Sequence, residues 1–373
     1  MIDALLNLVT KNNPHAQINI VTGSNEASKE AQKKGLIPLE IWKHAFSPSR
    51  ILQELKALSP DALVVVGADV MDGYYNSYLP LHAIMFADIA SRLGARSVIL
   101  GFSFNKTPSL LLKQVFELAN PAVKINLRDS VSLDRFEAFC DHKTQLVADA
   151  AFYLEPKLKS KLADEVKEWV EKAHAENALA IVFNIHPMLF KKGSSKQVQN
   201  LIDAAARAIE AVSSSRSVRW FFLPHDFRKD VGDNDCLLPL AAELTKRGVG
   251  DNILTVEKNY TASELKAAVG QVDGVITARM HLAIGSLGMG RPVAAITYQD
   301  KFQGLFRHFN LPNWLLLSPQ EILESDALEK MILRFLDENV EIKQCVENNL
   351  PSIMALSYKN FEFILAAAAQ GES

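Results

Sequence analysis

The sequence has 373 residues, which is the length of about two ordinary domains. Hydrophobic residues make up 48%, charged residues 22%, and the formal net charge is -3, so the composition is that of a globular protein with no sign of nucleic-acid binding. The three cysteines lie far apart and offer no metal-binding spacing, a pattern typical of reduced thiols in a cytoplasmic protein.

The start of the chain is apolar, but it lacks a basic segment, and Lys11 and Asn12 follow at once. This pattern predicts an amphipathic helix rather than a signal peptide. No apolar run approaches the ~18 residues of a membrane span. We therefore expect a cytoplasmic protein with at most peripheral membrane contact.

In the first half, β-rich runs alternate with helical segments. Strands are expected at 17–21, 62–66, 97–100 and 123–127, and helices at 49–58, at 79–93 and from about 130. The run ALVVV at 62–66 is almost continuously apolar, as in parallel strands that are buried on both faces. The alternation predicts a doubly wound parallel sheet.

A lysine-rich segment with Pro156 interrupts the pattern near 151–161, and the alternation then restarts. Further strands are expected at 178–185, 218–223, 252–256, 274–278 and 292–297, and the chain is expected to be helical from about 319. We predict an α/β protein with two Rossmann-like domains, 1–158 and 159–340, and a last helix, 341–373, that packs back on the first domain. Ligands bind beyond the carboxyl ends of such strands, so we expect the chemistry in a cleft between the domains.

The segment TARMHLAIGSLGMGRPVAAITYQDKFQGL, 277–305, is the most informative. Arg279 and His281 follow a predicted strand and stand at the start of a predicted helix, where the helix dipole favours an anion. An arginine fork matches a carboxylate or a phosphate, and a histidine can transfer a proton near neutral pH. The alternative is a buried arginine and a histidine of the core. The glycines do not form G-x-G-x-x-G, so a nicotinamide site is not supported.

This segment resembles the C-terminal signature of the polysaccharide pyruvyl transferases, in which Arg-x-His is followed by a helix of small residues, a Gly-x-Pro-Val strand, a Tyr and a Lys. Gly290 to Val293, Tyr298 and Lys301 match the later parts. LPHD at 223–226 and NLRDSVSLDRF at 126–136 also resemble segments of that family.

The resemblance implies a fold of the GT-B type and transfer of an enolpyruvyl group from phosphoenolpyruvate to two hydroxyls of a sugar. The acceptor would be a surface polysaccharide precursor or a lipid-linked oligosaccharide, and no redox cofactor would be needed beside phosphoenolpyruvate as co-substrate; no metal ligands are identified in the sequence. Carried over by position, Arg279 and His281 would hold phosphoenolpyruvate, with His281 as the candidate acid. The donor carries a phosphate and a carboxylate, so several cationic groups are needed.

Four more residues are candidates for the donor site, each with a structural alternative: Lys301, Arg128, His225 and Arg228. Lys301 can equally be a solvated loop residue, and Arg128 can equally pair with a neighbouring carboxylate. Asp233 and Asp235 are expected to be solvated loop residues rather than metal ligands.

The segment VVVGADVMDGYYNS, 64–77, follows a predicted strand and offers carboxylates, an amide and tyrosines for a sugar. The acceptor candidates in and near it are Asp69, Asp72, Tyr74, Tyr75, Asn76 and Ser103. Asp72 is the candidate base for the acceptor hydroxyl. The alternative interpretation is a polar turn with packed tyrosines.

The family usually begins with a strand and a loop of the type Gly-x-x-Asn-x-Gly-Asp, and this sequence has neither. We therefore expect an edge or a gap in the first sheet. Two other functions compete with pyruvyl transfer. One is a GT-B glycosyltransferase that uses a nucleotide sugar, and the other is a non-catalytic relative that binds a sugar or an anion.

Overall fold

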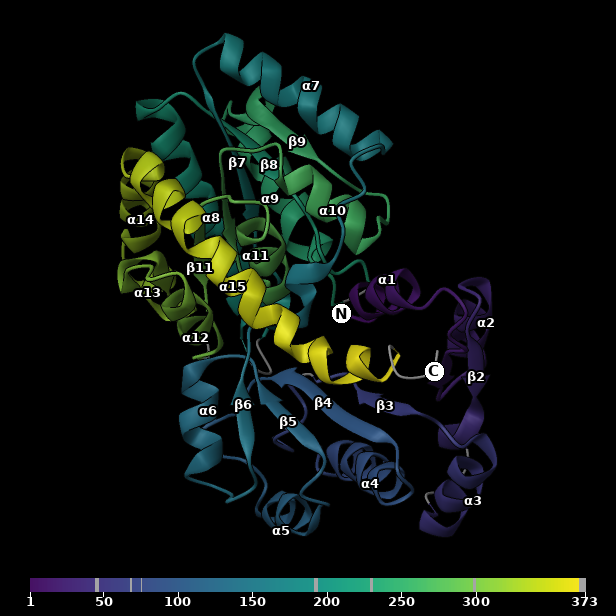
Figure 1. Cartoon of the computed structure of the whole chain (residues 1–373). Helices are drawn as coiled ribbons and strands as arrows, with labels where there is room; N and C mark the ends of the chain where they lie inside the picture. The colour runs from purple at the N-terminus through teal and green to yellow at the C-terminus, as the bar shows by residue number, and fades with distance from the viewer. Residues whose placement is uncertain are drawn as a thin grey trace. The chain divides into compact units, whose positions relative to one another are not determined.

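The computed structural model describes residues 1–43, 47–67, 69–74, 76–190, 194–228, 231–297 and 300–368. The chain forms two compact units (Figure 1). Unit 1 comprises Met1–Tyr153 and the segment from Ala355 onward, and unit 2 comprises Leu154–Met354. The division thus falls at 153/154 and inside the last helix, whereas the sequence placed it at 158/159 and 340/341.

Unit 1 contains two separate parallel sheets. The first pairs β1 (Asn19–Val21) with β2 (Ile37–Leu39). The second has the order β3-β4-β5-β6, and its strands are β3 (Ala62–Val65), β4 (Arg96–Phe102), β5 (Lys124–Leu127) and β6 (Thr144–Leu146). Within the described residues, β1 and β3 do not pair, which agrees with the edge or gap expected for the first sheet.

The helices of unit 1 connect these strands in the right order for a Rossmann-like domain. They are α1 (Ile2–Asn12), α2 (Asn25–Lys33), α3 (Pro48–Leu58), α4 (Tyr78–Arg92), α5 (Leu110–Leu118) and α6 (Ser130–Glu137). The end of α15 (Asn339–Ala368) also belongs to this unit. There, the Asn360 side chain accepts a hydrogen bond from Gly101 N at 2.7 Å and donates one to Ala148 O at 2.8 Å.

Unit 2 is built on one six-stranded parallel sheet of order β12-β11-β10-β7-β8-β9. Its strands are β7 (Leu179–Asn184), β8 (Val218–Phe222), β9 (Ile253–Thr255), β10 (Gly274–Thr277), β11 (Val293–Ile296) and β12 (Leu316–Leu317). The chain starts in the middle, at β7, proceeds to one edge, and returns to β10 on the other side of β7. The order therefore reverses between β7 and β10, where doubly wound sheets bind their ligands.

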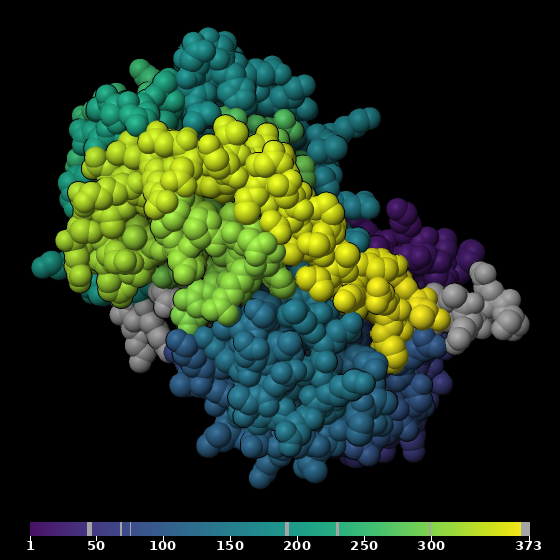
Figure 2. All heavy atoms as spheres, turned by 60° about the vertical axis from the view of Figure 1, so that its left-hand side comes forward, coloured from purple at the N-terminus to yellow at the C-terminus, as the bar shows by residue number. Residues whose placement is uncertain are grey.

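Two groups of helices pack in unit 2. One consists of α8 (Ser195–Ser215), α9 (Asn234–Lys246), α13 (Pro319–Glu324) and α14 (Ala327–Asp337), and the other of α7 (Lys161–Ala175), α10 (Ala262–Val269) and α11 (Met280–Leu287). Helix α12 (Lys301–His308) follows β11. In Figure 2, α13 and α14 form a yellow-green outer layer of this unit. The apolar strands β7 and β8 lie buried between such layers, as their sequences LAIVFN and VRWFF predict.

Candidate active site

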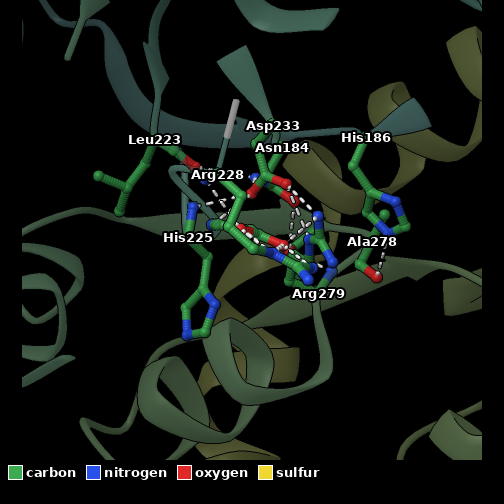
Figure 3. Close-up of polar contacts among 10 residues, drawn as sticks. Asn184, His186, Leu223, His225, Arg228, Asp233, Ala278 and Arg279 are labelled. Carbon is green, nitrogen blue, oxygen red and sulfur yellow. Dashed lines mark hydrogen bonds and ion pairs between the residues drawn. The ribbon is translucent and has the colours of Figure 1, made fainter. Parts of the chain in front are cut away.

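The polar residues of unit 2 gather where β7, β8 and β10 end. Asn184 is the last residue of β7 and His186 follows it, Leu223, His225 and Asp226 come after β8, Asp233 precedes α9, and Arg279 comes after β10. Figure 3 shows these side chains together at this edge of the sheet. Two of the three strands, β7 and β10, flank the point at which the strand order reverses.

Arg279 lies immediately before α11 and has the extended backbone of an N-cap residue. Its backbone N donates to Thr277 Oγ1 at 2.9 Å, which fixes the turn from β10 into the helix. The guanidinium donates through Nε at 2.8 Å and Nη2 at 2.6 Å to Asp233 Oδ1. These bonds use Nε and Nη2 of the guanidinium.

The Asp233 carboxylate is fully buried and organises the site. Its second oxygen, Oδ2, accepts from Asn184 Nδ2 at 2.8 Å, from His225 N at 2.8 Å and from Asp226 N at 3.2 Å. Asp233 thus connects β7, the loop after β8 and Arg279. The expectation that Asp233 is a solvated loop residue was wrong, because its carboxylate is buried and accepts hydrogen bonds from the backbone after β8. Its neighbour Asp235 is exposed, as expected.

The rings of His225 and His281 lie next to each other near this carboxylate. The ring of His225 points away from Asp233 (Figure 3) and stacks on the ring of His281, with centroids 6.3 Å apart and an interplanar angle of 11°. His281 is the second residue of α11 and is exposed. Burial, and then the neighbouring His281, lower the pKa of His225 to about 4, so this ring is neutral at neutral pH.

His186 was not identified from the sequence. It is buried, and its Nε2 lies 3.3 Å from Ala278 O, so this nitrogen carries the proton. Its Nδ1 has no hydrogen-bond partner among the described residues. Burial and then the charge of Arg279 lower the pKa of His186 to about 4. An unpaired acceptor beside an arginine indicates a site that a protonated group or a water molecule completes.

Arg228, a predicted donor ligand, is mostly exposed and pairs with Asp226 through Nε at 3.0 Å and Nη2 at 2.5 Å. The hydrogen bond from Arg228 holds the pKa of Asp226 down at about 2. Asp226 also lies 3.4 Å from Arg279 Nη2. The two arginines and two aspartates therefore balance in charge at this edge.

Lys301, the other candidate cation, is the first residue of α12 and is partly buried. It follows β11, the strand next to β10, and so lies beyond the same sheet edge. Tyr298, which matched the resemblance, lies outside the described residues, and so does Tyr75 of the acceptor candidates.

The acceptor candidates are in unit 1. Asp72 is fully buried and accepts from Tyr74 N at 2.8 Å and from Asn105 N and Nδ2 at 3.0 and 2.9 Å. Asn76 Oδ1 accepts from Tyr78 N at 2.8 Å, and Ser103 is buried. These contacts favour the alternative interpretation, a polar turn, over the role of Asp72 as a base.

Arg128 also lies in unit 1, after β5. Its buried guanidinium donates through Nη1 to Asp149 at 3.1 Å and through Nη2 to Asp69 at 2.6 Å. The nearby carboxylates raise its pKa against the effect of burial. Arg128 and Asp69 thus form the structural ion pair that the sequence left open, rather than separate donor and acceptor contacts.

Two absences concern the described part of the chain alone. There, no group of three or more His, Cys, Asp or Glu side chains is arranged to hold a metal ion. In the same residues, every helix is too short or too polar to cross a bilayer.

Comparison with solved structures assigns the fold to the GT-B class, with two Rossmann-like domains. A glycosyltransferase from Rickettsia africae has a TM-score of 0.57 and 13% identity and covers 99% of this chain and 94% of its own. Anabaena HepE in complex with UDP and glucose has a TM-score of 0.56 and 13% identity, over 98% and 93%. A Siraitia grosvenorii UGT transferase in complex with UDP has a TM-score of 0.58 and 10% identity, over 99% and 96%.

The sequence itself carries the finer assignment. The family model of the polysaccharide pyruvyl transferases matches residues 1–300, and the chain belongs to this family. No curated protein matches the sequence.

Proposed function

We propose that this protein transfers an enolpyruvyl group from phosphoenolpyruvate to two hydroxyls of one sugar in a polysaccharide or its precursor, and that unit 2 binds the donor. The observation that carries the proposal is the arrangement of Arg279 before α11, braced by the buried Asp233 and flanked by His281. A guanidinium, a helix N-terminus and histidines on one sheet edge are suited to a small, highly charged anion.

We assign each group of the site a role in this reaction. Arg279 would bind the donor through Nη1, because Nε and Nη2 donate to Asp233. The positive end of the α11 dipole adds to this attraction. His281, exposed on the first turn of α11, supplies a proton to the methylene carbon of the donor.

The reaction balances with these groups. Protonation of the methylene carbon leaves a cation at the adjacent carbon, which the first sugar hydroxyl attacks. The second hydroxyl then displaces phosphate from the same carbon. The two hydroxyl protons end on the proton donor and on the departing phosphate, so the products are the pyruvate ketal and inorganic phosphate.

One observation favours a second candidate, a glycosyltransferase that uses a nucleotide sugar. The structure of HepE, which shares the fold, is described as a complex with UDP and glucose. A sugar diphosphate would also use a cation at a helix N-terminus. The charge balance of Arg279 and Arg228 with Asp226 and Asp233 does not separate the two donors, because phosphoenolpyruvate carries at least as much negative charge as a sugar diphosphate.

Calorimetric titration with phosphoenolpyruvate tests the proposal, with Arg279→Ala and the matched control Arg216→Ala. Arg216 is an exposed arginine that pairs with Asp337 elsewhere in unit 2. We expect Arg279→Ala to weaken binding about 100-fold, from the loss of charged hydrogen bonds, and the control to bind normally. Absence of binding by the unaltered chain would refute the donor assignment. Binding of UDP-glucose in its place would select the second candidate.

A further inference from the structure

His225 is held at its backbone by the same carboxylate that braces Arg279. Its backbone N donates to Asp233 Oδ2 at 2.8 Å, and the next amide, that of Asp226, donates to the same oxygen at 3.2 Å. The other oxygen of Asp233 accepts from the Arg279 guanidinium at 2.6 and 2.8 Å. Because the Asp233 side chain is fully buried, these bonds fix the backbone from which the His225 ring extends.

The ring of His225 points away from this carboxylate (Figure 3) and lies against the ring of His281. The two rings are nearly parallel, with an interplanar angle of 11° and centroids 6.3 Å apart. His281 is exposed on the first turn of α11, where side chains ordinarily exchange rotamers within nanoseconds. A flat partner beside its ring removes part of that freedom, so the contact favours one orientation of His281.

The ring of His225 is also uncharged. Burial and then the charge of His281 lower the pKa of His225 to about 4. The carboxylates of Asp233 and Asp226 oppose this shift, and the guanidinium of Arg279 adds to it. A second imidazolium at this distance would repel a protonated His281, whereas a neutral ring neither repels it nor competes for its proton.

We propose that His225 is a positioning residue, whose uncharged ring holds the imidazole of His281 in the orientation from which His281 gives its proton to phosphoenolpyruvate. His225 itself neither gains nor loses a proton in the reaction. It acts on the donor through His281, which differs from the role of donor ligand that the sequence suggested. The inference rests on the proposed function, because the proton transfer that it serves belongs to that reaction.

Nuclear magnetic resonance of the full chain with isotope-labelled histidine rings tests the contact before any ligand is added. We expect His225→Ala to lower the order parameter of the His281 ring by about a third, the difference between a rigid and a flexible site. His225→Phe, which keeps a flat ring, should restore it. The matched control is His174→Ala, since His174 is exposed and pairs with Asp273 elsewhere in unit 2; this variant should leave His281 unchanged.

The same spectra follow the charge of His225. In the unaltered chain its ring signal should stay constant between about pH 5 and pH 8. A midpoint inside this range would overturn the proposal, and so would an unchanged order parameter in His225→Ala or a value in His225→Phe no higher than in His225→Ala. Circular dichroism shows whether the variants fold. If His225→Ala does not fold, His225→Gln, which keeps a polar side chain but no ring, takes its place.

Addition of phosphoenolpyruvate separates this inference from the proposed function. In the unaltered chain it should shift the ring signal of His281. If it shifts no histidine signal, the proposed function fails and the role of His225 fails with it. If it shifts His281 while His225→Ala leaves the order of that ring unchanged, the positioning role alone is overturned.

Discussion

Asp233→Asn should strongly destabilise unit 2. The carboxylate is fully buried, and its two oxygens accept five hydrogen bonds, two from Arg279 and three from the loop after β8 and Asn184. An asparagine amide has one acceptor oxygen, so its NH₂ group would have to face donors, either those of Arg279 or those of Asn184 and the backbone after β8. Removing one partner of a buried ion pair costs about 3–5 kcal/mol. We expect about 3 kcal/mol, since Arg279 keeps some exposure.

Urea denaturation measures this loss as a change in the free energy of unfolding. Asp235→Asn is the matched control, because Asp235 is an exposed residue of the same helix start. A further variant, Arg279→Leu with Asp233→Asn, should recover part of the loss, since it removes the unpaired charge. A loss below about 1 kcal/mol for Asp233→Asn would show that water replaces the carboxylate and that Asp233 does not brace the arginine.

Three further outcomes are expected. His281→Gln should lower kcat about 100-fold or more, with little change in phosphoenolpyruvate affinity, because it removes the proton donor; single-turnover kinetics would test this, and unchanged turnover would exclude His281 as the acid. The folded pKa values of His186 and His225 are about 4, below the unfolded value of about 6.5, so the unfolded chain binds more protons between these values. Stability should therefore fall by up to about 2 kcal/mol for each histidine between pH 6.5 and pH 5 in urea titrations, and a flat profile would contradict the lowered pKa values of the two rings. Gly67→Ala should cost about 3 kcal/mol, because a Cβ there would lie 1.8 Å from Leu100 O; a normal melting temperature would contradict this packing.

The sequence predicted most of the elements because parallel strands buried on both faces are continuous apolar runs. The run ALVVV identified β3, and the pattern before Arg279 identified β10 and the start of α11. The short edge strands β2, β6 and β12 were not predicted, since a strand of two or three residues has no readable period.

Pairing was harder to predict from the sequence than position. Asp233 lies 46 residues from Arg279, and no local pattern connects the two. The sequence allowed Arg128 to bind either a ligand or a neighbouring carboxylate. Its two partners, Asp69 and Asp149, lie far from it in the sequence and reach it only in the folded structure. His186 had one available signal: two polar residues, Asn184 and His186, stand at the end of an apolar strand, which resembles the setting of Arg279.

The two separate sheets of unit 1 have a consequence for local unfolding of the chain. Among the described residues, β3 is an edge strand whose side chains are all half-buried, whereas β7 has a neighbour on each side and five buried residues of six. Backbone amides on the outer side of β3 therefore need fewer hydrogen bonds to open before they are exposed to water. We expect amide hydrogen exchange to be fast along β3 and slow along β7.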